Sequence, residues 1–248
     1  MNQMVVTGII LSTSPIGEYD RRVVLLTKEL GKISAFAKGA RRPNSPMVGM
    51  VNPFSFGDFT IYVGRSSYTI QSVKISNYFS DLREDMEAAY YGFYFLEVTD
   101  YVSKEGNEER EMLRLLYQSL RALLSLAIPN ELIRYIFELK VFCIQGMAPQ
   151  LSQCVVCQAH NPPADFSVSK GGLLCAKCNK NPQLTISLDK STLYTLQYIV
   201  GSTIEKLYSF TVSDEVLRLL KRVMEQYKAM YMDKQFKSLD ILQALYKS

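Results

Sequence analysis

The sequence predicts an α+β fold in which a five-stranded antiparallel β-barrel precedes an α-helical domain with an inserted four-cysteine loop. Residues 3–78 consist of short apolar and β-branched runs separated by Gly and Pro turns, as in small barrels. From about residue 81 the apolar residues recur at helical spacing. Two Cys-x-x-Cys pairs then interrupt the helical pattern. The predicted domains are residues 1–79 for the barrel, 80–149 and 184–248 for the helical domain, and 150–183 for the inserted loop.

Each predicted barrel strand ends at a turn signal. The strands are expected at residues 4–13, 21–28, 32–38, 54–63 and 67–78. Gly17, Gly31 and Gly64 punctuate them. In the fourth strand the parity of the apolar residues changes between Phe56 and Phe59, which predicts a β-bulge at Gly57–Asp58. Five short strands of this kind are typical of an OB-like barrel.

The helical part begins with a change of pattern near Ser80. Asp81, with Glu84 three residues later, predicts a capping pair at the start of the first helix. Glu108, Glu109 and Glu111 are expected to open the second helix, because carboxylates are favourable at a helix N-terminus. Four more helices are expected at residues 130–145, 189–200, 216–231 and 239–246, with Ser213 capping the third of these.

The spacing of four cysteines predicts a structural zinc site. Cys154 and Cys157 form one pair, Cys175 and Cys178 the other, and 17 residues separate the pairs. This matches four-cysteine zinc sites, in which two tight turns together direct four sulfurs at one tetrahedral ion. Four thiolates leave no open position for a substrate, so the ion would be structural. Two disulfides or a redox Cys-x-x-Cys are the alternatives, but disulfides need an oxidising compartment and a redox pair leaves the second pair unexplained.

Two further residues could be considered as ligands. Cys143 shares a helical face with Leu132, Ile136 and Leu139, which predicts a buried free thiol. His160 is the only histidine, and it is expected to be a loop residue because four thiolates already fill the shell.

Composition and motifs favour a protein without catalytic activity. The chain has 248 residues and is 48% hydrophobic, which is enough for a substantial core. No apolar run reaches the roughly 18 residues of a membrane span, and no targeting segment is evident, so we expect a cytoplasmic protein with no membrane partner. P-loop, dinucleotide-binding, H-E-x-x-H and EF-hand patterns are missing from the sequence. With one histidine, acid–base catalysis has few candidate residues, and we predict that the protein is not an enzyme.

Positive charge is concentrated in the predicted barrel. Residues 1–79 hold nine basic and four acidic residues, whereas the rest of the chain holds 19 basic and 20 acidic ones. This asymmetry suggests a nucleic-acid partner, although a solvated basic surface is an equally ordinary explanation. OB-type barrels bind strands across their second and third strands and the adjoining loops. The candidate DNA-binding residues at these places are Lys38, Arg41, Arg42, Arg21, Arg22, Arg65 and Lys32. Tyr19, Phe36, Tyr62 and Tyr68 could stack on bases, although barrel aromatics are more often core residues.

The order of these parts resembles the bacterial RecO family of recombination mediators. The segment Ile16-Gly17-Glu18-Tyr19-Asp20-Arg21 is similar to the family's entry into the second strand. Lys38-Gly39-Ala40-Arg41-Arg42 is similar to its KGARR segment, and Pro53-Phe54 leads the fourth strand as it does in the family. The resemblance covers nearly the whole chain.

The resemblance implies a specific set of activities and partners. It implies binding of single- and double-stranded DNA, annealing of complementary strands, and no nucleotide consumption. It also implies action with RecR to replace single-strand DNA-binding protein by the RecA recombinase, hence a cytoplasmic, nucleoid-associated protein. Carried over by motif, Lys38, Arg41 and Arg42 would bind DNA. The zinc ligands would be Cys154, Cys157, Cys175 and Cys178.

Two other functional classes stay open at this point. One is a zinc-ribbon transcription- or translation-associated factor, although the insert holds only Lys170 and Lys177 between the outer cysteines and lacks the basic, aromatic strands of a nucleic-acid ribbon. The other is a thiol oxidoreductase, which would reduce disulfides and lose its metal on turnover.

Overall fold

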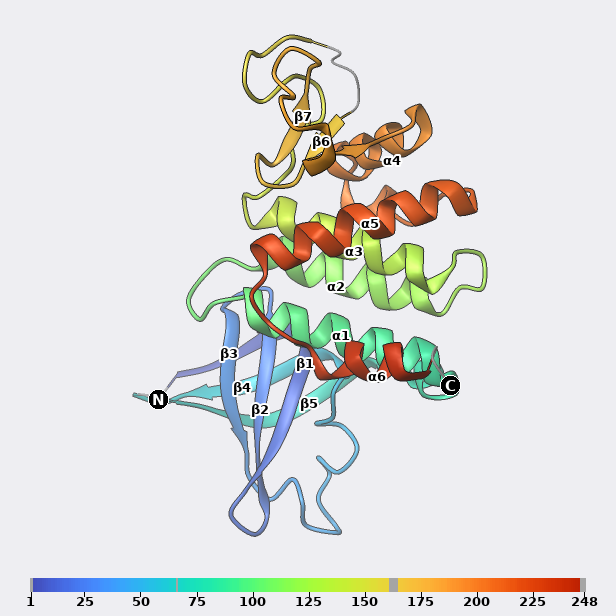
Figure 1. Cartoon of the computed structure of the whole chain (residues 1–248). Helices are drawn as coiled ribbons and strands as arrows, with labels where there is room; N and C mark the ends of the chain where they lie inside the picture. Colours follow the sequence, from blue (N-terminus) through green and yellow to red (C-terminus); the bar gives the residue numbers. More distant parts are fainter. Residues whose placement is uncertain (1, 66, 161–164, 246–248) are drawn as a thin grey trace. The chain divides into compact units, whose positions relative to one another are not determined.

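The fold is α+β, and its two parts are compact. The computed structural model describes residues 2–65, 67–160 and 165–245. One compact unit comprises residues 1–124 and 236–248, and the other comprises residues 125–235. The first contains the barrel and three helices, and the second contains three further helices and the four-cysteine loop (Figure 1). The domain boundaries taken from the sequence remain a proposal about how the chain is organised.

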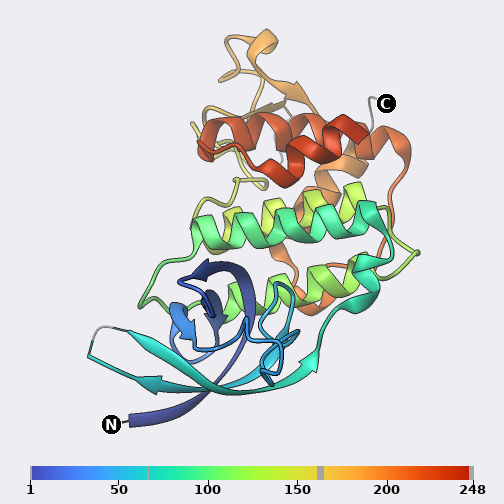
Figure 2. The same cartoon turned by 90° about the horizontal axis from the view of Figure 1, so that it is seen from below.

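Five strands close into the predicted OB-like barrel. They are β1 (Asn2–Ile16), β2 (Asp20–Thr27), β3 (Gly31–Ala37), β4 (Phe56–Val63) and β5 (Tyr68–Asn77). Their order around the barrel is β1-β2-β3-β5-β4, and β4 pairs back onto β1. The barrel is not wholly antiparallel as predicted, because β3 and β5 pair in parallel at Ala35 and Phe36. Figure 2 shows β4 and β5 as a long hairpin.

The barrel interior follows the period-2 pattern of its strands. Val23, Leu25, Ile33, Ala35 and Phe59 are buried in one core cluster, while alternate residues point outwards. The loop between β3 and β4 covers one end of this core. Its residues Ala40, Met47 and Val51 pack against the cluster, so the loop that carries the basic segment is anchored at several points.

A register shift occurs beside the predicted bulge position, but the bulged strand is β5 and not β4. The register between β4 and β5 shifts between Phe56 and Gly57 and again between Thr60 and Ile61, and in both places the extra residue lies on β5. Phe56 keeps the strand's regular alternation and faces outwards, where its ring lies 4.6 Å from that of Tyr117. The alternation of apolar residues predicted a bulge in this strand on the assumption that every apolar residue faces the barrel interior. An outward-facing residue can also be apolar when a helix packs on it. Phe54 precedes the strand and has a positive φ of 74°.

Helices α1 (Met86–Val102), α2 (Arg110–Leu123) and α6 (Lys237–Leu245) belong to the barrel's unit. The Asp81–Glu84 capping pair is wrong: Ser80–Arg83 form a 3-10 turn, and the carboxylate of Asp85 accepts from the N–H groups of Glu87 and Ala88 to cap α1. Two of the three glutamates expected to open α2 precede it, and only Glu111 lies in its first turn. Helices α1 and α6 lie side by side (Figure 1). The last predicted helical residue, Tyr246, lies outside the described residues.

A close backbone contact between the β2–β3 turn and the α1–α2 loop provides a stability test. Gly31 has a φ of 64°, and a Cβ there would overlap the carbonyl oxygen of Asn107. Gly106, in the facing loop, has a φ of 79° but open space around it. We expect Gly31→Ala to lower the free energy of unfolding by about 2–4 kcal/mol, because strain and overlap add.

The matched control is Gly106→Ala, which should cost only about 1 kcal/mol, the backbone cost alone. Urea denaturation of both variants measures the difference. Equal destabilisation would mean that the approach of Asn107 to Gly31 is unimportant for stability.

The second unit contains α3 (Asn130–Ile144), α4 (Lys190–Gly201) and α5 (Asp214–Tyr231). The carboxylate of Asp189 caps α4, and Ser213 caps α5 as predicted. Lys140 of α3 donates to the carbonyls of Ile199, Val200 and Ser202 at 3.4, 3.1 and 2.7 Å, which satisfies the C-terminus of α4. Short 3-10 turns occur at Pro182–Leu184 and Ile204–Lys206.

A small sheet supports the inserted loop. It consists of β6 (Asp165–Ser167), β7 (Gly172–Leu174) and β8 (Ile186–Ser187), in the order β7-β6-β8. The cysteine pairs flank the β6–β7 hairpin in sequence, one before β6 and one directly after β7. Within the described part of the chain, no helix combines the length and the apolar character needed to cross a membrane.

Candidate metal centre and nucleic-acid surface

The four cysteines of the two pairs form one cluster. The sulfurs of Cys154, Cys157, Cys175 and Cys178 all lie within 4.8 Å of one another. The Cys157 and Cys175 sulfurs are 3.6 Å apart. Cys154 is buried, whereas Cys157 is exposed. The cluster is therefore compact enough for all four sulfurs to bind one metal ion.

Two tight turns give the cluster its shape. In the first, the N–H of Gln158 donates to the carbonyl of Cys154, and Gln158 has a φ of 60°. In the second, the N–H groups of Cys178 and Asn179 both donate to the carbonyl of Cys175. The N–H of Cys175 donates to the Cys154 sulfur at 3.4 Å and so connects the two turns. Backbone donors directed at sulfur stabilise thiolates, the form that binds metal.

The pKa values of three of these thiols are shifted, two downwards and one upwards. A hydrogen bond from the backbone N–H of Cys157 is the main reason why the pKa of Cys154 is lowered to about 6. The N–H of Cys178 likewise lowers the pKa of Cys175. The hydrogen bond between the Cys178 and Cys175 sulfurs raises the pKa of Cys178 to about 12. A divalent cation neutralises the charge of clustered thiolates, so this donor set fits a metal ion.

Side chains connect this loop to the helices of its own unit. The ring of Phe166, on β6, is fully buried and lies 6.1 Å from that of Tyr227 on α5. The hydroxyl of Tyr231 donates to the carbonyl of Val168 at 3.0 Å. The hydroxyl of Tyr227 donates to the carbonyl of Met147 at 2.9 Å. Disorder in the loop would therefore disturb α5 as well.

The two other candidate ligands lie outside the cluster. His160 is exposed and pairs with Gln153 in an isolated β-bridge. Cys143 is half-buried on α3, not fully buried as predicted, and burial raises the pKa of its thiol. Within the described residues, the four predicted cysteines form the group that could hold a metal ion.

The basic segment of the barrel, residues 38–42, forms an exposed turn that we call the basic loop. Lys38, Arg41 and Arg42 are all exposed. The loop lies against the β1–β2 turn: the N–H of Arg41 donates to the carbonyl of Tyr19 at 2.9 Å, and the guanidinium of Arg41 donates to the carbonyl of Gly17 at 3.3 Å. The guanidinium carbon of Arg42 lies 5.2 Å from the centre of the Tyr19 ring. The fold therefore gathers three exposed cations and an exposed aromatic ring at one end of the barrel.

Asp20 holds the basic loop in position. Its carboxylate accepts from the N–H of Gly39 at 2.7 Å, and Gly39 has a φ of 67° that suits glycine. No role for Asp20 was predicted from the sequence. The available signal was an aspartate placed directly before Arg21 and Arg22, since an acid there can accept from backbone N–H groups of a neighbouring turn. Tyr19 is 42% exposed, and its hydrogen bond with Glu18 raises the pKa of its hydroxyl.

The other four predicted DNA-binding residues have different surroundings. Arg22 is exposed on the outer face of β2, and its Nε donates to the hydroxyl of Ser34 at 2.7 Å. Arg21 is half-buried and donates to the carbonyl of Val51 and the side chain of Asn52, which ties β2 to the loop after the basic segment. Arg65 is exposed in a separate turn between β4 and β5.

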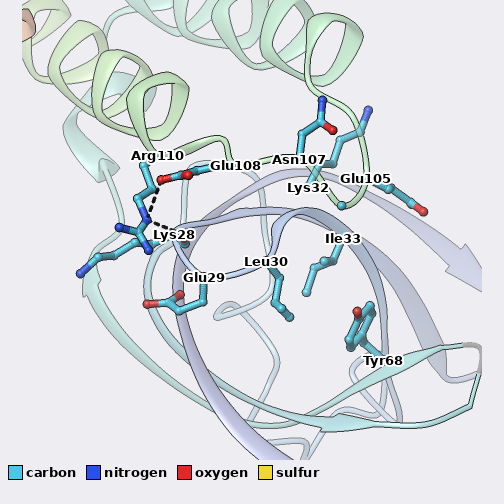
Figure 3. A pocket seen from close by; sticks show the side chains of 11 residues that line it. Lys28, Glu29, Leu30, Lys32, Ile33, Tyr68, Glu105, Asn107, Glu108 and Arg110 are labelled. Carbon is cyan, nitrogen blue, oxygen red and sulfur yellow. Dashed lines mark hydrogen bonds and ion pairs between the residues drawn. The ribbon is translucent and has the colours of Figure 1, made fainter.

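Lys32 points towards the helices rather than the open face. Its Nζ donates to the backbone carbonyl of Asp100 at 2.6 Å and lies 3.2 Å from the Asp100 carboxylate. Figure 3 shows it beside Glu105 and Asn107 of the α1–α2 loop. Arg21 and Lys32 are thus half-buried, whereas Lys38, Arg41, Arg42 and Arg22 are exposed.

The chain matches two family models that together cover almost its full length. The model described as "Recombination protein O N terminal" matches residues 1–79. The model described as "Recombination protein O C terminal" matches residues 83–240.

Curated relatives give the same result. The "DNA repair protein RecO" of Alkaliphilus metalliredigens is 34% identical over 236 residues, which are 94% of this chain and 96% of the relative. That of Acetivibrio thermocellus is 32% identical over 247 residues, covering 99% and 98%. That of Bacillus cereus is 27% identical over 242 residues, covering 98% and 97%.

Proposed function

Since the chain belongs to the RecO family of DNA repair proteins, we propose that it is a DNA-binding recombination mediator that anneals complementary strands. The observation that carries this proposal is the basic loop, which has three exposed cations and a backbone held by Asp20 and Tyr19 at one end of the barrel. Phosphates on two strands would be neutralised there and brought together without covalent chemistry. Arg22 extends the surface along β2, and Arg65 would contribute from the β4–β5 turn.

The partners in this proposal follow from the family. The protein would act with RecR to replace single-strand DNA-binding protein by RecA on single strands. It would bind both single- and double-stranded DNA, act in the cytoplasm at the nucleoid, and carry out no catalysis. Arg21 and Lys32 would act indirectly, by fixing the loop and the β2–β3 turn.

The cysteine cluster is proposed to hold a structural Zn²⁺ ion. Four thiolate donors and a closed shell are typical of structural zinc, with Zn–S distances of about 2.3 Å. When bound, the ion would cross-link the two turns, and its filled coordination shell would leave no position for a substrate. Cys154, Cys157, Cys175 and Cys178 would all be ligands.

A salt titration tests the mediator proposal. Binding is measured with labelled single- and double-stranded oligonucleotides of unrelated sequence, with strand annealing read in parallel. We expect both forms to bind, log K to fall linearly with log salt, and annealing to accelerate. Absence of binding at low salt would refute the proposal, and strong preference for one sequence would favour a zinc-ribbon transcription factor instead.

A further inference from the structure

A second surface of the barrel's unit has the composition of a ligand site. A pocket of about 300 Å³ lies between the outer face of the barrel and α2. Phe56 of β4 and Leu113 and Tyr117 of α2 supply its apolar lining. The Phe56 and Tyr117 rings, with centres 4.6 Å apart and planes inclined at 51°, present an aromatic surface. Such a volume is at the small end for ligand pockets and suits one planar group rather than an extended molecule.

The rim of this pocket is cationic. Lys28, Arg110 and Arg114 line it, and no acidic residue is among the described lining residues. Two carboxylates beside Thr7 are already bound there: Glu29 accepts from its N–H at 2.9 Å, and Asp58 accepts from its hydroxyl at 2.8 Å. The rim therefore favours an anionic ligand.

Arg110 is placed so that it can exchange its partner. Its Nε lies 3.4 Å from the Glu108 carboxylate, and both side chains are mostly exposed, at 57% and 75%. Exposed ion pairs contribute little, so a phosphate can replace the carboxylate at small cost. Figure 3 shows Arg110 between Glu108 and Lys28. The Nε of Arg110 also donates to the backbone carbonyl of Lys28 at 3.3 Å. The neighbouring pocket in that view shares Lys28 and Arg110 but is lined by Glu29, Glu105 and Glu108, which disfavours an anion there.

We propose that the pocket between α2 and β4 binds one unstacked nucleotide of a single strand. The base would lie on Phe56 and Tyr117, and its phosphates would contact Arg110, Arg114 and Lys28. An aromatic surface beside cations is the usual arrangement for sequence-tolerant binding of single strands, because every base has a π-face. A base paired in a duplex cannot enter, so the site selects unpaired strand.

This site would give the proposed mediator two places for DNA, and in this respect the inference rests on the proposed function. Arg21 lies near one end of β2, and Lys28 lies just past the other end. Lys28 is seven positions along the chain from Arg21, which corresponds to about 23 Å in an extended strand. A strand held at the pocket and another at the basic loop would both be bound by one barrel, which is what pairing two strands requires.

Binding measurements on two matched arginine variants test the pocket. Arg114 lines it, and Arg121, exposed in the last turn of the same helix, does not belong to its lining. We expect Arg114→Ala to weaken binding of a short oligothymidine about tenfold and to lower the slope of log K against log salt by about 0.7. Arg121→Ala should change affinity less than about twofold, because it removes charge but no contact. Equal effects of the two variants would overturn the proposal.

Photocrosslinking of the wild-type protein tests the base contact without disturbing the aromatic packing. An oligonucleotide carrying 5-iodouracil should crosslink to Phe56 or Tyr117, as mapped by mass spectrometry. A strand of abasic residues with the same phosphates should compete poorly, since stacking typically contributes about 1–3 kcal/mol per base. Crosslinks confined to other residues would refute the site, as would protection of Tyr117 by an acidic peptide but not by DNA.

The outcome also separates this inference from the proposed function. A crosslink at Tyr117 that persists in a variant without the basic-loop charges would support the pocket even if the basic loop proves unimportant. Loss of oligonucleotide binding in that variant, with no crosslink at Phe56 or Tyr117 in the wild type, would support the basic loop and overturn the pocket.

Discussion

Replacing Cys175 by serine is expected to abolish metal binding and to loosen the unit of residues 125–235. Cys175 is central to the cluster: its sulfur lies 3.6 Å from that of Cys157, and its N–H donates to the Cys154 sulfur. Serine keeps the N–H bond but removes one thiolate, so the shell cannot close. Structural zinc contributes about 10–16 kcal/mol in zinc-finger peptides, which is comparable to the roughly 5–15 kcal/mol total stability of many domains. Losing even a part of that free energy would strongly destabilise the unit.

The loss should spread through the contacts that join the loop to α5. Phe166 would no longer be held beside Tyr227, and the Tyr231 hydroxyl would lose the fixed carbonyl of Val168. We expect faster proteolysis between residues 150 and 190 and faster amide exchange in α5. The barrel belongs to the other compact unit and should keep its protection.

Zinc content by atomic emission and amide exchange by mass spectrometry measure both effects. Cys143→Ser is the matched control, because that half-buried thiol lies outside the cluster and should leave zinc content unchanged. Treatment of the wild type with a chelator should reproduce the Cys175→Ser phenotype. Normal zinc content in Cys175→Ser would refute the ligand assignment, and lost DNA binding with an intact fold would make the metal a direct participant in binding.

The sequence predicted most of this architecture because its patterns were local. Cysteine spacing identified the four clustered residues, and Gly31 and Gly64 marked turns that the barrel uses. Errors arose where a distant element decides the environment. Phe56 suggested a bulge because α2, more than fifty residues later, covers it. A second kind of error was local: Asp85 rather than Asp81 caps α1, because either aspartate can cap a helix and the sequence does not show which one has the extended backbone of a cap.

The predicted site residues show the same limit. Charge and motif located the basic loop, but they could not distinguish a cation facing solvent from one with an internal partner. Lys32 and Lys38 flank the same strand, yet Lys32 is bound to Asp100 of α1, and Lys38 is exposed. The aromatic pocket was missed altogether, because Phe56 and Tyr117 come together only when α2 packs on the barrel.

Neutralising the basic loop with Lys38→Ala, Arg41→Ala and Arg42→Ala together is expected to weaken DNA binding by about a hundredfold to a thousandfold at 50 mM salt. Each lost phosphate contact lowers the slope of log K against log salt by about 0.9 for duplex and 0.7 for single strands, so three contacts should lower it by about 2.7 and 2.1. The fold should survive, because all three side chains are exposed and the loop's anchors, Ala40 and Val51, remain. Annealing should slow in parallel with binding.

A second triple variant controls for net charge. Arg83, Arg222 and Lys237 are exposed and lie outside the basic loop, so their replacement by alanine removes the same charge from other places. If long-range attraction alone governed binding, both triples would weaken it equally and with similar salt slopes. A larger effect of the basic-loop triple, with the slope reduced by the predicted amount, would show that phosphates contact this loop directly. Normal binding and annealing in the basic-loop triple would contradict the assignment, and the DNA path would then have to follow Arg22 or the pocket between α2 and β4.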